Sequence, residues 1–269
     1  MTEPHELTFD VADDVLKALQ RGKLDLRSLP EIIVAHEIGP FLELLYALGI
    51  THNRAIVPSI VPTGSSLTAF ARALATNCTD WAPGGDCRVG FYRTLHREAE
   101  RDADRHTLFG LRAQAAAEAS GFGKRTAQGF VGAMFEIEDN IFEHSDAYST
   151  GLVAFQGCKG AFTFVVGDTG LGVLDTLRET SRYRSLTDHG NAIRLALQDG
   201  VSRFSDTDPN RGRGFHNLFV GLASLRGQLR FVSGDHAQLI EGKEPTLASY
   251  RLIQKPAWTG FMASVTCHI

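Results

Sequence analysis

The chain has 269 residues, of which 43% are hydrophobic and 22% are charged, and its formal net charge is −4 at pH 7. A chain of this length is typical of two globular domains, and the slightly acidic balance argues against nucleic-acid binding as the main function. No apolar run approaches the length that spans a bilayer, and the N-terminus lacks the charged and apolar regions of a signal peptide. We therefore expect a cytoplasmic protein without a membrane segment. Its cysteines lack C-x-x-C spacing and are expected to be reduced thiols: Cys78, Cys87, Cys158 and Cys267.

The first part of the chain, residues 1–107, alternates short strand-like and helix-like stretches, which predicts a small α/β domain. These stretches cover residues 7–9, 14–20, 32–34, 40–48, 54–61 and 65–75. Residues 81–86 are rich in glycine and proline and are predicted to form a loop. Residues 91–105 are predicted to form a charged helix that leads into a second domain, residues 108–269.

A helix with polar residues along one margin is predicted around Glu136. Glu136, Asn140 and His144 are spaced by four residues and therefore lie on one stripe of a helix. An apolar stripe beside it predicts the buried face: Phe130, Met134, Ile137 and Ile141. Desolvating a carboxylate costs several kcal/mol unless a partner compensates, so this position favours a functional role for Glu136. The alternative is an ordinary solvated helix face.

A strand and a turn follow the helix. Residues 152–156 and 161–167 are predicted to form a hairpin, and the second strand runs directly into Asp168. Gly170 and Gly172 would let the backbone turn sharply and approach a ligand closely. A carboxylate fixed at this place can accept a hydrogen bond from an exocyclic amine such as that of adenine. The alternative is a β-turn, in which Asp, Thr and Gly are all common.

A long polar connection, residues 174–209, holds one predicted helix near residues 192–198, stopped by Gly200. A connection of this length inside a compact domain is usually functional.

A second pair of glycines, Gly212 and Gly214, stands just before a predicted helix. Helix N-termini carry free N–H groups, and glycines let a phosphate come near them, while Arg211 and Arg213 add positive charge. The alternative is a flexible loop. Strands are predicted at residues 228–232, 247–253 and 261–268, with Thr259-Gly260 as a weaker candidate for a late phosphate contact.

These patterns, in this order, resemble the gyrase, histidine-kinase and MutL (GHKL) superfamily of ATP-binding domains. The resemblance covers residues 126–269 and rests on E-x-x-x-N at Glu136 and Asn140, and on D-x-G-x-G from Asp168 to Gly172. It implies the Bergerat fold, a two-layer α/β sandwich with a mixed, mostly antiparallel sheet, here preceded by the small α/β domain.

The resemblance also implies ATP and Mg²⁺ as ligands, with roles for individual residues. Glu136 matches the residue that activates the attacking water, Asn140 the Mg²⁺ ligand, and Asp168 the carboxylate that reads adenine. Gly170 and Gly172 match the turn beneath the nucleotide. The residues expected to lie at the phosphates are Gly212, Arg213 and Gly214.

Three classes of function stay open. The first is a slow ATPase that acts as a nucleotide-dependent regulatory switch, and the second is a protein kinase that phosphorylates a histidine or serine of a partner. The third is a module that binds ATP without turnover. A switch without an output domain of its own acts through a protein partner, either another regulatory protein or a second copy of this chain.

Two further resemblances concern the N-terminal domain. Its alternation of elements is weakly similar to the STAS-type domains that pair with such ATPases in bacterial partner switching. Residues 35–40 resemble the phosphoacceptor box of sensor histidine kinases at His36. That box has one residue fewer before Pro40 than usual, and prolines and glycines break the segments that follow, so a structural or surface His36 is favoured.

Overall fold

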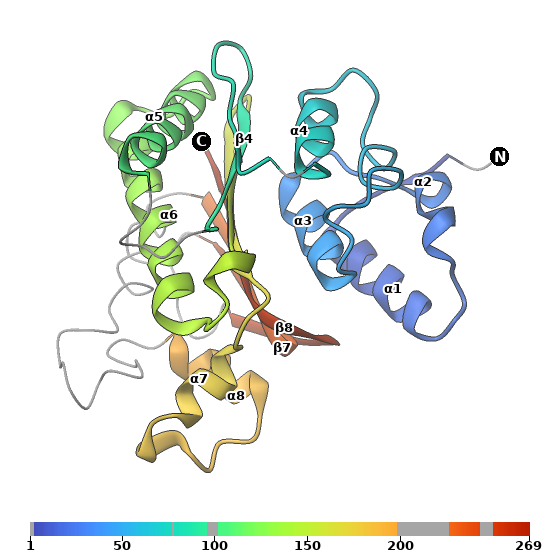
Figure 1. The fold of residues 1–269 in the computed structure, drawn as a ribbon, viewed down its shortest axis with the longest axis vertical. Coiled ribbons are helices and arrows are strands. Elements are labelled where there is room, and N and C mark those ends of the chain that lie inside the picture. Colours follow the sequence, from blue (N-terminus) through green and yellow to red (C-terminus); the bar gives the residue numbers. More distant parts are fainter. Residues whose placement is uncertain (1–2, 77, 96–101, 198–225, 243–249) are drawn as a thin grey trace.

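The computed structural model describes residues 3–76, 78–95, 102–197, 226–242 and 250–269. Its centre is a six-stranded sheet with the strand order β3-β4-β5-β6-β8-β7, in which every neighbouring pair is antiparallel (Figure 1). The strands are β3 (Asp80–Trp81), β4 (Val89–Arg93), β5 (Leu152–Cys158), β6 (Ala161–Asp168), β7 (Arg226–Gly242) and β8 (Tyr250–His268). The chain is thus a mixed α/β protein with an antiparallel sheet, as the sequence predicts.

Two long helices, α5 (Ala103–Ala119) and α6 (Lys124–His144), cover one face of the sheet (Figure 1). The predicted apolar stripe of α6 is buried, and the Phe130 ring stacks on Phe162 of β6 with centroids 5.3 Å apart. Shorter helices flank strands β5 and β6 in the chain. The helix η3 (Tyr148–Thr150) precedes β5, and α7 (Val173–Arg178) and α8 (His189–Ala196) follow β6, with the short helix η4 (Ser181–Tyr183) between them.

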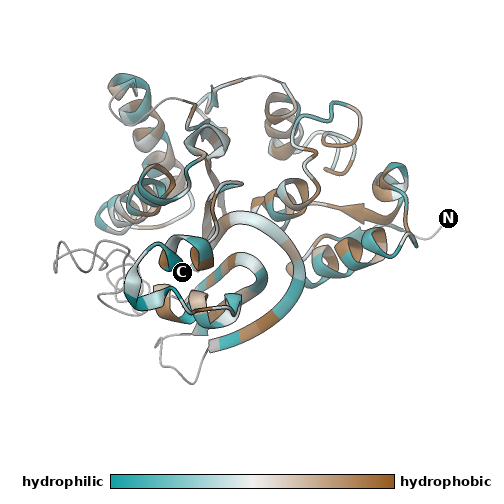
Figure 2. Cartoon of the chain, turned by 60° about the horizontal axis from the view of Figure 1, so that its bottom comes forward, coloured by the Kyte–Doolittle hydropathy of each residue, from teal (hydrophilic) through white to brown (hydrophobic). Residues whose placement is uncertain are grey.

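A small N-terminal α/β part packs against the other face of the sheet (Figure 1). Its parallel strands are β1 (His5–Glu6) and β2 (Ile33–Val34), and its helices are α1 (Phe9–Gln20), η1 (Leu26–Ser28), α2 (Leu29–Ile32), α3 (Ile38–Ala47) and α4 (Ser66–Leu74). Along α1 and α4, hydrophilic and hydrophobic residues alternate (Figure 2), which is typical of helices that bury one side, whereas nearly every residue of α3 is buried. Phe70 of α4 meets Phe91 of β4 edge to face at 5.4 Å, so the N-terminal part and the sheet share one core.

A buried network of four charges also joins the N-terminal part to the sheet. Arg230 of β7 lies 2.8 Å from Asp13 of α1 and 2.8 Å from Glu43 of α3. Lys255 of β8 contacts Glu43 as well and lies 3.5 Å from Asp13. Two carboxylates therefore balance two cations away from water, an arrangement that demands good geometry. The division into domains 1–107 and 108–269 stays a prediction; β3 and β4, which precede residue 108, pair within the same sheet.

The predicted helix over residues 91–105 is wrong. Residues 89–93 form strand β4 instead, because an apolar and aromatic run pairs along its whole length with β5. The helix begins only at Ala103, where the Asp102 side chain accepts a hydrogen bond from the Arg105 N–H as an N-cap. It continues to Ala119, over residues for which the sequence analysis predicts no element.

The strands predicted near the C-terminus are longer than expected. Residues 228–232 lie within the 17-residue β7, and residues 261–268 lie within the 19-residue β8. A register shift between Ser233 and His236 lets β7 bend while it stays paired with β8. Of the predicted strand 247–253, residues 250–253 belong to β8 and the rest lie outside the described residues.

Candidate functional site

Asp168 ends strand β6 and is fully buried, with 0% of its surface exposed. Its Oδ1 accepts a hydrogen bond from the Gly170 N–H at 2.7 Å, whereas Oδ2 has no hydrogen-bond partner among the described residues. Burial raises the pKa of this carboxyl from 3.8 to about 7, against the opposing effect of the Gly170 hydrogen bond. A buried acceptor without a partner is costly, and this one is suited to a donor from a ligand.

The turn after Asp168 is fastened to the end of helix α6. The Leu171 N–H donates to the Ser145 carbonyl at 2.7 Å. A Cβ on Gly170 would lie 2.1 Å from that same carbonyl oxygen, and one on Gly172 would lie 2.9 Å from Ser233 Oγ. Neither glycine has a positive φ, so the reason for glycine here is close packing and not an unusual turn conformation. Gly170 thus packs against the protein backbone and Gly172 against a serine hydroxyl, and their predicted close approach to a ligand stays a prediction.

Two side-chain hydroxyl groups fix the same turn by hydrogen bonds. Thr150 Oγ1 accepts the Thr169 N–H at 3.0 Å. Ser233 Oγ accepts the Val173 N–H at 3.0 Å and donates to the Gly260 carbonyl at 2.9 Å. Gly260 has a φ of +82° and lies against the backbone of Asp168, so the Thr259-Gly260 segment supports the turn. Its predicted phosphate contact stays a prediction.

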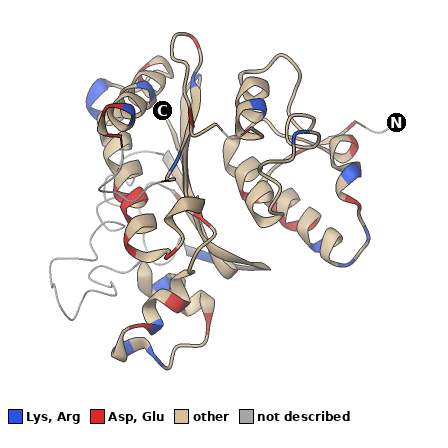
Figure 3. Ribbon diagram, viewed as in Figure 1, with Lys and Arg blue, Asp and Glu red and all other residues tan. Residues whose placement is uncertain are grey.

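Helix α6 carries the other two predicted residues toward its C-terminal half. Glu136 is exposed, and partial burial nevertheless raises the pKa of its carboxyl. Asn140 is half-buried, and its Nδ2 donates to the carbonyls of Glu136 and Ile137 at 3.1 and 3.3 Å. Because Nδ2 is engaged with the backbone, the amide oxygen is the atom that Asn140 offers to a ligand. Acidic residues gather on this half of α6 (Figure 3).

Helix α6 ends beside the Asp168 turn, which brings the two predicted motifs to one end of the sheet. Ser145, the C-cap of α6, is the residue to which Leu171 is bonded. Asn140 lies five residues, or about 7.5 Å of helix rise, before that cap. The Thr176 hydroxyl of α7 further bonds to the His144 carbonyl at 3.2 Å. The end of α6, the end of β6 and the turn are therefore joined by hydrogen bonds at one end of the sheet.

The sequence analysis missed a buried acid on the same helix. Glu138 is fully buried, and its Oε2 lies 2.8 Å from His106 Nε2 of α5. The His106 ring stacks on Phe135 at 3.9 Å. The pair joins α5 to α6. The signal was available, because Glu138 follows Met134 by four residues and precedes Ile141 by three, which places it on the apolar face.

The predicted phosphate-contacting residues Gly212, Arg213 and Gly214 lie outside the described residues, as do Arg211 and the helix expected after them. The polar connection is described as far as residue 197. Its predicted helix near residues 192–198 is α8, which begins earlier because Asp188 caps it by accepting the Asn191 N–H at 2.6 Å. Helix α7 and the turn η4 were not predicted, and buried Leu174, Leu177 and Ala192 hold these pieces together.

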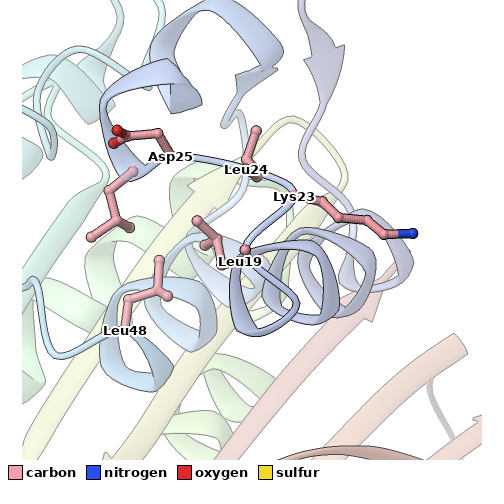
Figure 4. A pocket seen from close by; sticks show the side chains of 7 residues that line it. Leu19, Lys23, Leu24, Asp25 and Leu48 are labelled. Carbon is pink, nitrogen blue, oxygen red and sulfur yellow. The ribbon is translucent and has the colours of Figure 1, made fainter.

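Two surface grooves lie away from Asp168 and α6. One lies on the N-terminal part between α1 and α3, where Leu19, Lys23, Leu24, Asp25 and Leu48 line it (Figure 4). Another lies beside α4 and includes Arg72 and Trp81. Neither groove is lined by a predicted site residue, and both are open to solvent. The buried Asp168 is therefore a stronger candidate for a ligand contact than either groove.

The described ranges hold neither a cluster of candidate metal ligands nor a helix that could span a membrane. No group of three or more His, Cys, Asp and Glu side chains there is placed to hold a metal ion. None of the helices in the described part of the chain is long and apolar enough to cross a membrane.

Comparisons with known proteins give no family for the chain. No protein-family model matches its sequence, and a search of curated proteins finds no relative.

Proposed function

We propose that the chain binds ATP with Mg²⁺ in a Bergerat-type site and acts as a nucleotide-dependent regulatory switch with slow hydrolysis. The observation that carries this proposal is Asp168, whose buried Oδ2 lacks a partner among the described residues. The order of elements agrees with the resemblance: α6 with Glu136 and Asn140, then the antiparallel pair β5 and β6, then the glycine turn.

Adenine is the base that such a carboxylate suits. Its exocyclic amine donates hydrogen bonds, whereas guanine presents a carbonyl oxygen at the corresponding position, which would face the carboxylate acceptor to acceptor. A site built around one buried acceptor rejects a ligand that lacks the matching donor, because the acceptor is then left unpaired. Asp168 therefore favours adenine over guanine for a base that enters with this edge facing the carboxylate.

Magnesium suits the acidic half of α6. A triphosphate brought to Glu136 and Asn140 would meet negative charge, and a divalent cation between them relieves that repulsion. Mg²⁺ prefers oxygen ligands and keeps waters and phosphates in its coordination shell, so one protein ligand, the Asn140 amide oxygen, is sufficient.

Glu136 is the candidate general base. It lies one helical turn before Asn140, and its raised pKa makes the carboxylate a better proton acceptor than an ordinary glutamate. Such a base serves a water in hydrolysis or a partner's hydroxyl in phosphotransfer, so a protein kinase is the second candidate. A switch requires a partner whose affinity depends on the nucleotide, and this partner is another protein or a second copy of the chain.

We expect Asp168→Asn to weaken ATP binding by about 1–3 kcal/mol, because a charged acceptor for the adenine amine is replaced by an amide. Calorimetry at pH 8 with a non-hydrolysable ATP analogue measures the change. Asp175→Asn, an exposed aspartate of α7, is the matched control and should bind as the parent does. Unchanged affinity in a folded Asp168→Asn protein would rule out the role in base recognition.

The same substitution is expected to stabilise the protein without nucleotide at pH 8, by at least about 1 kcal/mol. The pKa of Asp168 is raised to about 7 in the folded state, so between pH 3.8 and 7 the folded state holds a proton that the unfolded state has lost. Stability from this group is therefore lost as pH rises toward 7, and the neutral amide of the variant would avoid that loss.

Urea unfolding of the parent and Asp168→Asn at pH 5 and pH 8 tests this sign. The stabilisation should be larger at pH 8 than at pH 5, while ATP affinity of the parent should rise as Asp168 ionises. A variant that is less stable than the parent at pH 8 would show that Asp168 serves the fold and not a ligand.

A further inference from the structure

The N-terminal part of the chain reaches the Asp168 turn through a tyrosine. Tyr46 lies on α3, with 7% of its surface exposed, and its hydroxyl donates to the Thr150 carbonyl at 3.3 Å. Tyr46 and Thr150 are 104 residues apart in the sequence. The N-terminal part therefore contacts the short helix η3, which stands directly before strand β5.

Thr150 uses its side chain to hold the turn at the site. Its Oγ1 accepts the N–H of Thr169, the residue after Asp168, at 3.0 Å, and donates to the Ala147 carbonyl at 2.8 Å. Thr150 thus accepts a hydrogen bond from the Tyr46 hydroxyl at its carbonyl oxygen and one from the turn after Asp168 at its side-chain hydroxyl. One residue connects two parts of the chain that are distant in sequence.

The surroundings keep the Tyr46 hydroxyl protonated and therefore a donor. Burial raises the pKa of its phenol, the nearby Arg93 guanidinium lowers it, and the Asp168 carboxylate raises it again, so the pKa lies above its ordinary value of 10.

We infer that Tyr46 is a positioning residue for the nucleotide site, which it controls from the N-terminal part through Thr150 and the Thr169 N–H. This inference rests on the proposed function for its consequence in ATP binding. Loss of the Tyr46 hydrogen bond would loosen Thr150 and the Asp168 turn, and with them the affinity for ATP.

The test uses the full chain and two substitutions that keep the shape of the side chain. Tyr46→Phe removes the donor, and Thr150→Val removes the hydroxyl that accepts the Thr169 N–H. Thr150→Ser keeps that hydroxyl and is the conservative control. Thr163→Val, which removes a buried hydroxyl bonded to Thr266 at the other end of β6, is the control for loss of a buried hydroxyl away from the turn.

Two readouts separate the outcomes. Amide hydrogen exchange without nucleotide should be about 2- to 10-fold faster at residues 169–171 in Tyr46→Phe and Thr150→Val, as expected for the loss of one hydrogen bond. Affinity for a non-hydrolysable ATP analogue should fall by a similar factor. Affinity for the corresponding GTP analogue, the control ligand, should not change, so the ratio of ATP-analogue affinity to GTP-analogue affinity falls. Thr150→Ser and Thr163→Val should match the parent in both readouts.

Each contrary result has one meaning. Unchanged exchange at residues 169–171 in Tyr46→Phe overturns the positioning role, and so does a uniform increase along β6, which would report only lower stability. A parent protein that binds neither nucleotide overturns the proposed function alone, because the exchange measurement still decides whether Tyr46 positions the turn. Faster exchange with an unchanged ratio of ATP to GTP affinity overturns the control of base recognition.

Discussion

Glu43→Ala is expected to lower the free energy of unfolding by about 3–5 kcal/mol, because it leaves two buried cations with a single carboxylate. Glu43 is 1% exposed and bonds both Arg230, at 2.8 Å, and Lys255. Urea unfolding at pH 7 measures the loss. Asp14→Ala, which removes an exposed ion pair with Lys17 on α1, is the matched control and should cost less than about 1 kcal/mol.

A double substitution tests whether the four buried charges act as a balanced set. Glu43→Met combined with Lys255→Met removes one charge of each sign and leaves Asp13 paired with Arg230, so it should be less destabilising than Glu43→Ala alone. If the double variant is the less stable of the two, the network does not act as a balanced set of charges.

The direction in which stability changes with pH follows from the same contacts. Burial raises the pKa of Glu43, but Lys255 and Arg230 outweigh burial and hold the pKa below its usual value of 4.5. The stability that Glu43 contributes is therefore present above about pH 4.5 and is lost as the pH falls below that value. Acid unfolding of Glu43→Gln should accordingly be less steep than that of the parent.

Glu136→Ala is expected to lower ATP hydrolysis by about 10²–10⁴-fold while ATP binding persists, because a missing general base affects the chemical step. Steady-state phosphate release measures the rate, and calorimetry measures binding. Glu118→Ala, which removes an exposed acid of α5, is the control. A Glu136→Ala protein that hydrolyses ATP at the parent rate would make Glu136 a structural or solvated residue.

The same pair of proteins distinguishes the two candidate functions. Labelled γ-phosphate that appears on a partner protein with the parent, and not with Glu136→Ala, favours the kinase. Release of free phosphate without transfer favours the switch with slow hydrolysis. Binding without either reaction would leave a module that holds ATP as a structural ligand.

Local periodicity was sufficient for the elements closest to the site. The apolar stripe of Phe130, Met134, Ile137 and Ile141 predicted the buried face of α6, and each of these side chains is buried. The hairpin of β5 and β6 was predicted from two apolar runs around a glycine turn and is found with its full register. Both succeed because the pattern that predicts each lies within a short stretch of chain: the helix bonds its own backbone, and β5 pairs with β6 across a tight turn.

Periodicity failed for α5, where the helix packs through small residues. Its apolar face consists largely of alanines and of Gly110, where a Cβ would lie 3.0 Å from the Phe135 ring. Such a face carries a weak hydrophobic pattern, because close approach of two helices and not side-chain size decides the packing. The aromatic run of β4 was wrongly joined to the charged residues after it for a related reason: its partner β5 lies far along the chain, beyond both long helices.

The sequence by itself determined the helix with Glu136 and Asn140, the strand that delivers Asp168, and the glycines of the turn. Only the tertiary structure decided that Asp168 is fully buried, that Tyr46 reaches Thr150, and that Arg230 meets Asp13 from 217 residues away. The physical reason is that periodicity reports which face of an element is apolar, whereas the partner of a buried polar group is chosen when whole elements pack. A buried charge or hydroxyl must find its partner there, and no local pattern records which residue that will be.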